Sequence, residues 1–256
     1  ELITTPTLPP YDLFCSGHSV LPDGRIFIQG GHDEADAHGQ SRATAYDPFT
    51  DTWDTSIPNM NAGRWYATNT ILPNGDVLVL NGAIDGYNNK NDLPQVWQLQ
   101  TNTWRNLITA EESEPTGLDF YPRMFVAPDG RVFKAGPDRD TWFLDTSGTG
   151  QWTRGPDMKF EGFRGYGSAV MFEEGKILVM GGADNPPTNT AEIIDLNEPN
   201  PQWQLVAPMH HASRHLNATL MADGKVLVTS GTSAQGFNNA DGLVTIAEIY
   251  DPATDT

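Results

Sequence analysis

The sequence predicts an all-β fold built from repeated four-stranded sheets, and two recurring phrases predict it. The first phrase is an apolar stretch, a turn that ends in Gly, and an apolar strand that also ends in Gly. Asp-Gly or Asn-Gly between apolar runs is typical of a short β-hairpin, because Gly adopts the positive φ that the turn needs. The phrase occurs five times, with turn glycines at Gly24, Gly75, Gly130, Gly175 and Gly224.

A second phrase follows the first in four repeats and ends in a tryptophan. We interpret each copy as a third strand, a tight turn, and a fourth strand opened by the Trp. These tryptophans are Trp53, Trp104, Trp152 and Trp203, spaced by 51, 48 and 51 residues. Four strands in about 50 residues, with paired glycines and a spaced Trp, are typical of the kelch form of a β-propeller blade. The paired Gly-His and Trp-Asp dipeptides of WD40 blades are not repeated from one repeat to the next.

The repeats cover the chain as one propeller segment, residues 1–256, and the last repeat is incomplete. The string AEIYDPATDT at residues 247–256 resembles YDPFTDT before Trp53, but it stops before the expected Trp. Five repeats are few for a self-closing ring, so we expect a seven-bladed ring whose remaining blades come from a segment outside this chain. The approximate repeat bounds are 12–60, 61–110, 117–158, 162–209 and 210–256.

Charge and composition exclude several classes of protein. The formal net charge of −18 argues against binding to nucleic acid or to an anionic membrane surface. No apolar run approaches the ~18–20 residues of a membrane-spanning helix, so we expect no membrane insertion. The single cysteine, Cys15, excludes an intrachain disulfide and a multi-cysteine metal cluster.

One position in the repeat carries residues with metal-binding chemistry. The residue nine before each turn glycine is expected to start the innermost strand, so equal offsets predict equivalent places around the propeller axis. Thiol, phenol and imidazole groups are ligands for copper and other transition metals. The bland alternative is core packing, which is the common role of aromatic residues and of a lone buried cysteine. The residues at this position are Cys15, Tyr66, Tyr121, Tyr166 and His215.

The strings around this position resemble those of the copper-radical oxidases, galactose oxidase and especially the glyoxal-oxidase-like proteins. The strings that carry the resemblance are DLFCSGH around Cys15 and RWYATNTILPNG around Tyr66, within the kelch frame. The resemblance implies that Cys15 forms a thioether to Tyr66, and that Tyr66 ligates copper and holds a catalytic radical. It further implies oxidation of an aldehyde or primary alcohol by O2, giving H2O2. An extracellular or periplasmic location is implied too, with the signal peptide not in this chain, which begins at Glu1.

The same resemblance leaves the copper site incomplete. The family also has an axial Tyr followed directly by His, and a further His later in the chain, and these would lie beyond Thr256. His215 is a candidate ligand, but Arg214 precedes it instead of Tyr. Galactose oxidase stacks an indole on the thioether ring from the hairpin after the Tyr, where this chain has NGAIDGYNN and no Trp. Trp65 is close in sequence, but its direction is not given by the sequence.

Other residues are candidates for the substrate pocket, and two rival functions stay open. We expect Tyr121 and Tyr166 to line the pocket and Arg164 to reach a substrate oxygen. One rival function is a non-catalytic kelch module that binds protein or glycan through its loops. The other is a degenerate oxidase relative that has kept the Cys15–Tyr66 pair and lost the copper ligands.

Overall fold

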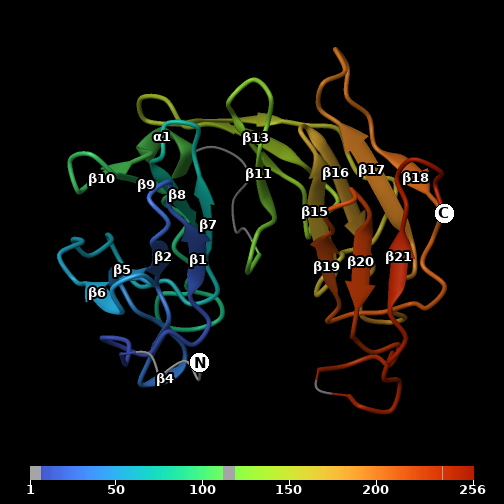
Figure 1. Ribbon diagram of the computed structural model, residues 1–256, viewed down its shortest axis with the longest axis horizontal. Helices are drawn as coiled ribbons and strands as arrows, with labels where there is room; N and C mark the ends of the chain where they lie inside the picture. The colour runs from blue at the N-terminus through green and yellow to red at the C-terminus, as the bar shows by residue number, and fades with distance from the viewer. Residues whose placement is uncertain (1–6, 112–118, 238) are drawn as a thin grey trace. The chain divides into compact units, whose positions relative to one another are not determined.

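The computed structural model describes residues 7–111, 119–237 and 239–256, and these residues form a nearly all-β structure (Figure 1). Each of the first four repeats forms one four-stranded sheet, and the described part of the fifth forms a three-stranded sheet. The one helix found among these residues is a single turn, α1 (Ile108–Glu111). No helix in the described part of the chain is long and apolar enough to cross a membrane.

Strands that are neighbours in a sheet follow one another along the chain, apart from a small inserted hairpin, β3 (His32–Asp33) and β4 (Ala35–Gly39). The first sheet comprises β1 (Gly17–Val20), β2 (Ile26–Gln29), β5 (Ala43–Asp47) and β6 (Thr52–Asp54). The second comprises β7 (Thr68–Ile71), β8 (Val77–Leu80), β9 (Gln95–Gln98) and β10 (Thr103–Asn106). The third comprises β11 (Met124–Val126), β12 (Val132–Lys134), β13 (Trp142–Asp145) and β14 (Gln151–Arg154). The fourth comprises β15 (Ser168–Glu173), β16 (Lys176–Met180), β17 (Ala191–Asp195) and β18 (Gln204–Val206), and the fifth comprises β19 (Asn217–Leu220), β20 (Val226–Thr229) and β21 (Glu248–Tyr250).

The turn glycines confirm the predicted hairpins. All five have φ between 75° and 87°, a region that residues with a Cβ rarely adopt. They are Gly24, Gly75, Gly130, Gly175 and Gly224. In the first hairpin the Gly24 N–H donates to the carbonyl oxygen of Leu21, and the Leu21 N–H donates to the carbonyl oxygen of Arg25. This two-bond closure recurs at the turn of Gly75, so the recurring phrase specifies a local backbone geometry.

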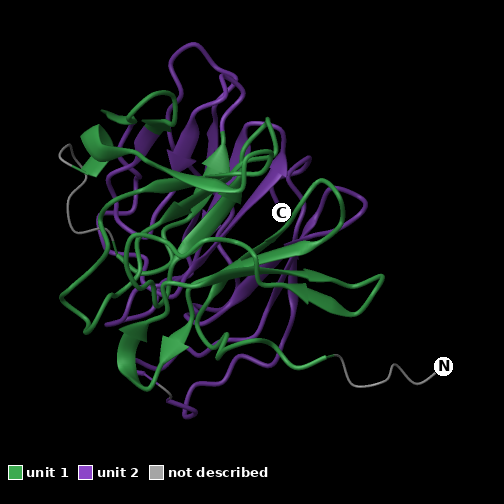
Figure 2. Ribbon diagram, turned by 90° about the vertical axis from the view of Figure 1, so that its left-hand side faces the viewer, with its two compact units in different colours: residues 1–126, 144–153 green, residues 127–143, 154–256 purple. Residues whose placement is uncertain are grey.

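The chain divides into two compact units, residues 1–126 with 144–153 and residues 127–143 with 154–256 (Figure 2). In unit 1 the first two sheets bury an apolar cluster between them, in which Phe27 of β2 stacks on Trp97 of β9 with ring centroids 4.9 Å apart. In unit 2 the fourth and fifth sheets bury Leu178, Met180 and Val226 in a second cluster. A single sheet cannot cover both of its faces, so each sheet depends on its neighbour for burial.

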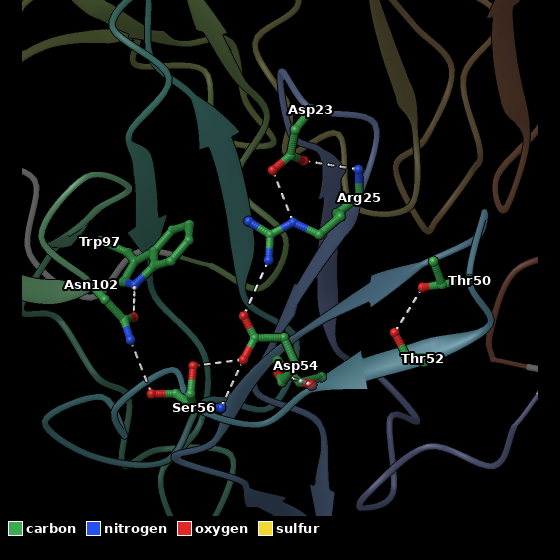
Figure 3. A network of polar contacts seen from close by, with 9 residues as sticks. Asp23, Arg25, Thr50, Thr52, Asp54, Ser56, Trp97 and Asn102 are labelled. Carbon is green, nitrogen blue, oxygen red and sulfur yellow. Dashed lines mark hydrogen bonds and ion pairs between the residues drawn. The ribbon is translucent and has the colours of Figure 1, made fainter.

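Polar contacts join the first and second repeats at the edge of this core in unit 1 (Figure 3). The Trp97 indole N–H donates to Asn102 Oδ1 over 3.0 Å, and the Asn102 amide donates to the carbonyl oxygen of Ser56 over 3.1 Å. Asp54 accepts from the Ser56 hydroxyl and from Arg25 Nη1, 3.1 Å away. The segment after β6 is thereby fixed to the turn between β9 and β10.

The repeated tryptophans differ slightly from the expectation. Trp53, Trp104 and Trp152 are the second residues of β6, β10 and β14, and Trp203 precedes β18. The Trp53 indole N–H donates to the carbonyl oxygen of Thr7 over 2.8 Å, and that of Trp104 donates to the carbonyl oxygen of Pro58 over 2.7 Å. The Trp53 indole therefore holds the segment that leads into the first repeat, and the Trp104 indole holds the segment that leads out of it.

Candidate functional site

The five residues at the repeated position share one backbone conformation. Their φ angles all lie in the left-handed region, between 48° and 63°. They precede the first strand of their sheet by two or three residues, so the expectation that they begin that strand was wrong. The left-handed turn changes the direction of the chain just before the strand begins. The side chain of the turn residue therefore does not follow the alternation of side chains between the two faces of the strand. The residues are Cys15, Tyr66, Tyr121, Tyr166 and His215.

Backbone hydrogen bonds connect neighbouring members of this set within each unit. In unit 1 the Tyr66 N–H donates to the carbonyl oxygen of Cys15 over 2.9 Å, and the Tyr121 N–H donates to that of Tyr66 over 3.0 Å. In unit 2 the His215 N–H donates to the carbonyl oxygen of Tyr166 over 2.8 Å. The structure therefore brings Cys15, Tyr66 and Tyr121 together in unit 1, and Tyr166 and His215 together in unit 2.

The side chains of Cys15 and Tyr66 lie against the same small apolar cluster, formed by Ala37, Trp65 and Ala83. Burial raises the pKa of the Cys15 thiol, and a side-chain hydrogen bond with Tyr66 opposes that rise. A thiol that hydrogen-bonds with a phenol is close enough to attack the phenol ring once that ring is oxidised. The arrangement is thus suited to forming a carbon–sulfur bond between the two side chains.

Tyr66 is also held by other aromatic rings. The indole of Trp65 stacks on it with ring centroids 3.7 Å apart and planes 7° apart. The ring of Tyr121 stacks on it at 4.7 Å and 24°, and Phe120 meets it edge-on at 5.6 Å. These contacts restrict rotation of the phenol. The stacking of Trp65 could not be predicted, because the side-chain direction of a residue beside a left-handed turn depends on what surrounds it.

Tyr121 differs from Tyr66 in its surroundings. It is 41% exposed, so one part of its side chain reaches solvent. Burial of the rest raises the pKa of its phenol, and the nearby Cys15 raises it further. Tyr121 therefore stays a neutral phenol over the physiological range, with an accessible edge beside Cys15 and Tyr66.

His215 and Tyr166 form an aromatic group in unit 2 with Phe237. The His215 ring lies 4.3 Å from the ring of Tyr166 and 5.5 Å from that of Phe237. Burial lowers the pKa of His215, and the Arg214 charge lowers it further, so the imidazole is neutral at physiological pH. Its Nε2 is buried and has no hydrogen-bond partner among the described residues. A neutral imidazole nitrogen without a partner has the chemistry of a metal ligand.

Cavities in unit 2 support only part of the predicted pocket. His215 lines a hollow of about 360 Å³ together with Thr232 and Leu243. A larger cavity of about 890 Å³ lies instead beside Ile193 and Asp251, and its lining includes none of the five repeated residues. Only the smaller of these two hollows adjoins one of the repeated residues, an imidazole with the chemistry of a metal ligand.

Arg164 does not lie where the sequence suggested. Its side chain is 0% exposed, and its guanidinium donates to Glu192 Oε1 over 2.8 Å and to the carbonyl oxygen of Gly181 over 3.0 Å. Arg64 is buried in the same way in unit 1. The expected contact of Arg164 with a substrate oxygen is contradicted, because its donors are used to hold the sheet. The sequence held a signal for this role, since both arginines stand eleven residues before a turn glycine, Gly75 or Gly175.

Each of the two units contains described side chains of a type that binds copper. Phenol, thiol and imidazole groups can all bind copper. The buried Nε2 of His215, which has no hydrogen-bond partner among the described residues, and the phenol of Tyr66, which hydrogen-bonds with the Cys15 thiol, fit that chemistry. Over residues 7–111, 119–237 and 239–256, no three His, Cys, Asp or Glu side chains form a group that could hold a metal ion. The residues therefore fit part of a copper site.

Comparison with known proteins decides the family. The family model described as "Glyoxal oxidase N-terminus" matches residues 5–256. The chain belongs to this glyoxal oxidase family. The chain is 29% identical to a galactose oxidase of Gibberella zeae, a match that covers 98% of the chain and 39% of that protein. It is 26% identical to the aldehyde oxidase GLOX of Vitis pseudoreticulata, over 94% of the chain and 49% of that protein.

Solved structures agree with the fold of the family. A structure described as a novel fungal alcohol oxidase of the AA5 family, in complex with copper, is 25% identical and has a TM-score of 0.82. That match covers 96% of this chain and 53% of the other. The structure of YjhT, at 12% identity and a TM-score of 0.65, shows the fold alone. The predicted all-β propeller fold class is thereby confirmed. This member of the glyoxal oxidase family spans about half or less of the length of the curated relatives described above.

Proposed function

We propose that the chain is the propeller portion of a copper-radical oxidase that oxidises an aldehyde or a primary alcohol with O2. The observation that carries the proposal is the contact of the Cys15 thiol with the Tyr66 phenol, at the positions that match the family's thioether pair. The overall reactions are RCH2OH + O2 → RCHO + H2O2 and, for a hydrated aldehyde, RCH(OH)2 + O2 → RCOOH + H2O2. Each removes two electrons and two protons from one carbon centre.

Four residues of unit 1 have a role in this proposal, namely Cys15, Trp65, Tyr66 and Tyr121. The phenolate of Tyr66 would hold copper, which when bound supplies the second one-electron acceptor beside the oxidised ring. Cys15, joined to the ring of Tyr66, fixes its orientation and lets the unpaired electron spread onto sulfur. The oxidised Tyr66 oxygen takes a hydrogen atom from the substrate carbon. Trp65 and Tyr121 hold the ring in place and exclude water from its faces.

Further parts of the proposal rest on Tyr121 of unit 1, on two residues of unit 2 and on the relatives. We retain Tyr121 and Tyr166 as candidates to line the substrate pocket, since they are 41% and 46% exposed. His215 stays a candidate nitrogen ligand on the strength of its orphaned Nε2. An aldehyde or alcohol substrate is supported by the names of the relatives, which are aldehyde, galactose and alcohol oxidases. An extracellular or periplasmic location is part of the same proposal.

The test is peptide mapping after the chain is loaded with copper in air. We expect a peptide in which Cys15 and Tyr66 are linked and two hydrogens are lost, by the balance RSH + ArH + O2 → RSAr + H2O2. Cys15→Ser is the matched control and gives no linked peptide. An alkylatable Cys15 with unmodified Tyr66 after copper loading would reject the proposal. A linked peptide in a full-length protein that makes no H2O2 from any aldehyde or alcohol would favour the degenerate relative.

A further inference from the structure

The stack on Tyr66 continues to the protein surface through a second tyrosine. Tyr87 meets the indole of Trp65 edge-on, with ring centroids 5.6 Å apart and planes 84° apart. The indole in turn lies parallel to Tyr66 at 3.7 Å. Three oxidisable rings therefore stand in direct contact in the order Tyr66, Trp65, Tyr87. Electron transfer between aromatic rings in van der Waals contact is fast, so this order is a continuous path.

The two ends of the path differ in exposure. Trp65 is only 4% exposed and packs against Ala37 and Ala83, whereas Tyr87 is 55% exposed. Phe120 covers the edges of all three rings, at 5.5 Å from Trp65, 5.6 Å from Tyr66 and 6.4 Å from Tyr87. The middle of the path is thus dry and its outer end is open to a soluble redox partner.

The outer end carries its own proton acceptor. The Tyr87 hydroxyl donates to Asp36 Oδ2 over 2.6 Å, a short bond from a phenol to a carboxylate. Oxidation of a phenol releases its proton, so a carboxylate in this position lowers the barrier to oxidation. Trp65 lacks such help, because its indole N–H is buried without a hydrogen-bond partner among the described residues. An oxidised Trp65 therefore keeps its proton, stays a strong oxidant, and takes an electron from Tyr87.

We propose that Trp65, Tyr87 and Asp36 form an electron-transfer path between Tyr66 and solvent. The path rests on the proposed function for its purpose, which is to exchange single electrons between the Tyr66 radical site and a soluble one-electron oxidant or reductant. A one-electron oxidant removes an electron from Tyr87 while the phenol proton moves to Asp36. The Tyr87 radical then takes an electron from the Tyr66 phenolate through Trp65 and recovers its proton from Asp36. The net change is one electron from Tyr66 to the oxidant.

Tyr121 is the competing exit, since it also stacks on Tyr66 and is 41% exposed. Hydrogen-bond geometry favours Tyr87. Tyr87 has the Asp36 carboxylate within hydrogen-bond distance to receive the proton. The variant Tyr121→Phe tests this competing exit.

The lone cysteine allows the path to be tested in the chain without copper. Cys15 is the only thiol in the sequence and lies beside Tyr66, so a ruthenium polypyridyl photo-oxidant tethered to it injects an oxidising equivalent at the inner end. Transient absorption distinguishes indole radicals from phenoxyl radicals after a flash. We expect the oxidising equivalent to reach Tyr87 as a phenoxyl radical. Tyr87→Phe should lower the yield of phenoxyl radical and lengthen the life of the indole radical on Trp65, and Asp36→Asn should slow phenoxyl formation by about tenfold or more.

A matched control exists in the same unit. The Tyr46 hydroxyl donates to Asp51 Oδ1 over 2.9 Å and its ring lies 4.9 Å from that of Trp53, so it reproduces the same three residue types elsewhere. Tyr46→Phe should change neither the yield nor the rate of phenoxyl formation. The proposal is overturned if Tyr87→Phe leaves the phenoxyl signal unchanged, or if Tyr121→Phe abolishes it.

A second measurement does not need a label on Cys15. Under steady illumination with a soluble ruthenium photo-oxidant, peptide mapping counts oxidation products at Trp65. We expect Tyr87→Phe to raise oxidation of Trp65 severalfold and Tyr46→Phe to leave it unchanged, and equal oxidation in both variants would contradict the path. Failure of the proposed function shows separately as an absent Cys15–Tyr66 thioether in the unlabelled chain, so the two failures are distinguishable.

Discussion

The backbone N–H of Tyr66 donates to the carbonyl oxygen of Cys15 over 2.9 Å, although the two residues are 51 positions apart in the chain. This bond joins the first and second repeats at the point where the thiol and the phenol meet. Because the bond uses only main-chain atoms, the two residues stay neighbours when either side chain is replaced. Substitutions at Cys15 or Tyr66 therefore test chemistry with little change in position.

The reactivity of the Cys15 thiol is the first prediction. Burial raises its pKa, and the charges of Asp36 and Asp12 raise it further, so the thiolate is scarce near neutral pH. We expect iodoacetamide to alkylate Cys15 more slowly than free cysteine at about pH 8, with a rate that keeps rising at higher pH. Asp12→Asn should speed the reaction, while Asp23→Asn, a control in the same unit, should not. A rate equal to that of free cysteine would contradict the expectation.

The second prediction concerns the residue six after each turn glycine, which has a positive φ in every repeat. Ser230 adopts 67° there, whereas the equivalent residue of the fourth repeat is Gly181 at 60°. Ser230→Gly should stabilise the protein by about 1 kcal/mol in urea unfolding, because a left-handed residue with a Cβ is strained. Gly181→Ser should destabilise it by roughly 2 kcal/mol or more, because its Cβ would lie 2.6 Å from Leu216 Cδ2. Equal and small effects of both substitutions would argue against strain at this position.

The third prediction concerns the buried ion pair of Arg164 and Glu192, both of which are 0% exposed. One Glu192 oxygen also accepts the backbone N–H of Lys159 over 2.7 Å. Glu192→Gln should cost about 3 kcal/mol in the free energy of unfolding, because it leaves a buried guanidinium without its counter-charge. The matched control is Glu173→Gln, which breaks an exposed pair with Lys176 and should cost less than about 1 kcal/mol. Similar losses in the two variants would show that the buried charge is not what matters.

The fourth prediction is a pH dependence that arises from Glu248. Burial alone would raise the pKa of Glu248, but hydrogen bonds from the backbone N–H groups of His210 and His211 lower it below its ordinary value. A lowered carboxyl pKa in the folded state means that the unfolded chain binds more protons in acid. The stabilisation is therefore present above the ordinary glutamate pKa and is lost as the pH falls through the lowered value.

The measurement for Glu248 is urea unfolding at a series of pH values. Glu248→Gln should be less stable than the unchanged protein by about 1–2 kcal/mol at neutral pH. The difference should shrink as the pH falls below about 4, where the carboxyl group is protonated. The exposed Glu198 gives the control, and Glu198→Gln should show no such trend. A difference that stays constant down to acid pH would contradict the prediction.

Much of the fold could be predicted from the sequence, because the repeated residues are those that the backbone geometry of each hairpin requires. The turn glycines need positive φ, and the alternation of apolar strands and turns needs little else to specify four strands. The repeated position was also found correctly, because a fixed offset from the turn glycine selects one place in every repeat. The conformation there was not predictable, since Cys and Tyr, which fill four of the five positions, carry no marked preference for a left-handed turn.

The candidate site was only partly predictable, because side-chain directions depend on three-dimensional surroundings. From the sequence alone, the Trp65 side chain could point into solvent or onto Tyr66. In the structure it packs against Ala37 and Ala83 and stacks on Tyr66. Arg164 was expected near the substrate, but it is held inside the sheet by Glu192, a partner 28 residues further along the chain. The hydrogen bond between Tyr87 and Asp36 could not be predicted, because the two residues are 51 positions apart and meet only in the folded structure.

The shared left-handed turn at Cys15, Tyr66, Tyr121, Tyr166 and His215 has one more consequence. The main chain adopts the same conformation at all five positions, so a thiol, a phenol and an imidazole are carried on equivalent backbone sites. Single substitutions can then exchange one reactive group for another while the surrounding sheets keep their shape. Such a frame would let the reactive group change at one position while the architecture around it is kept.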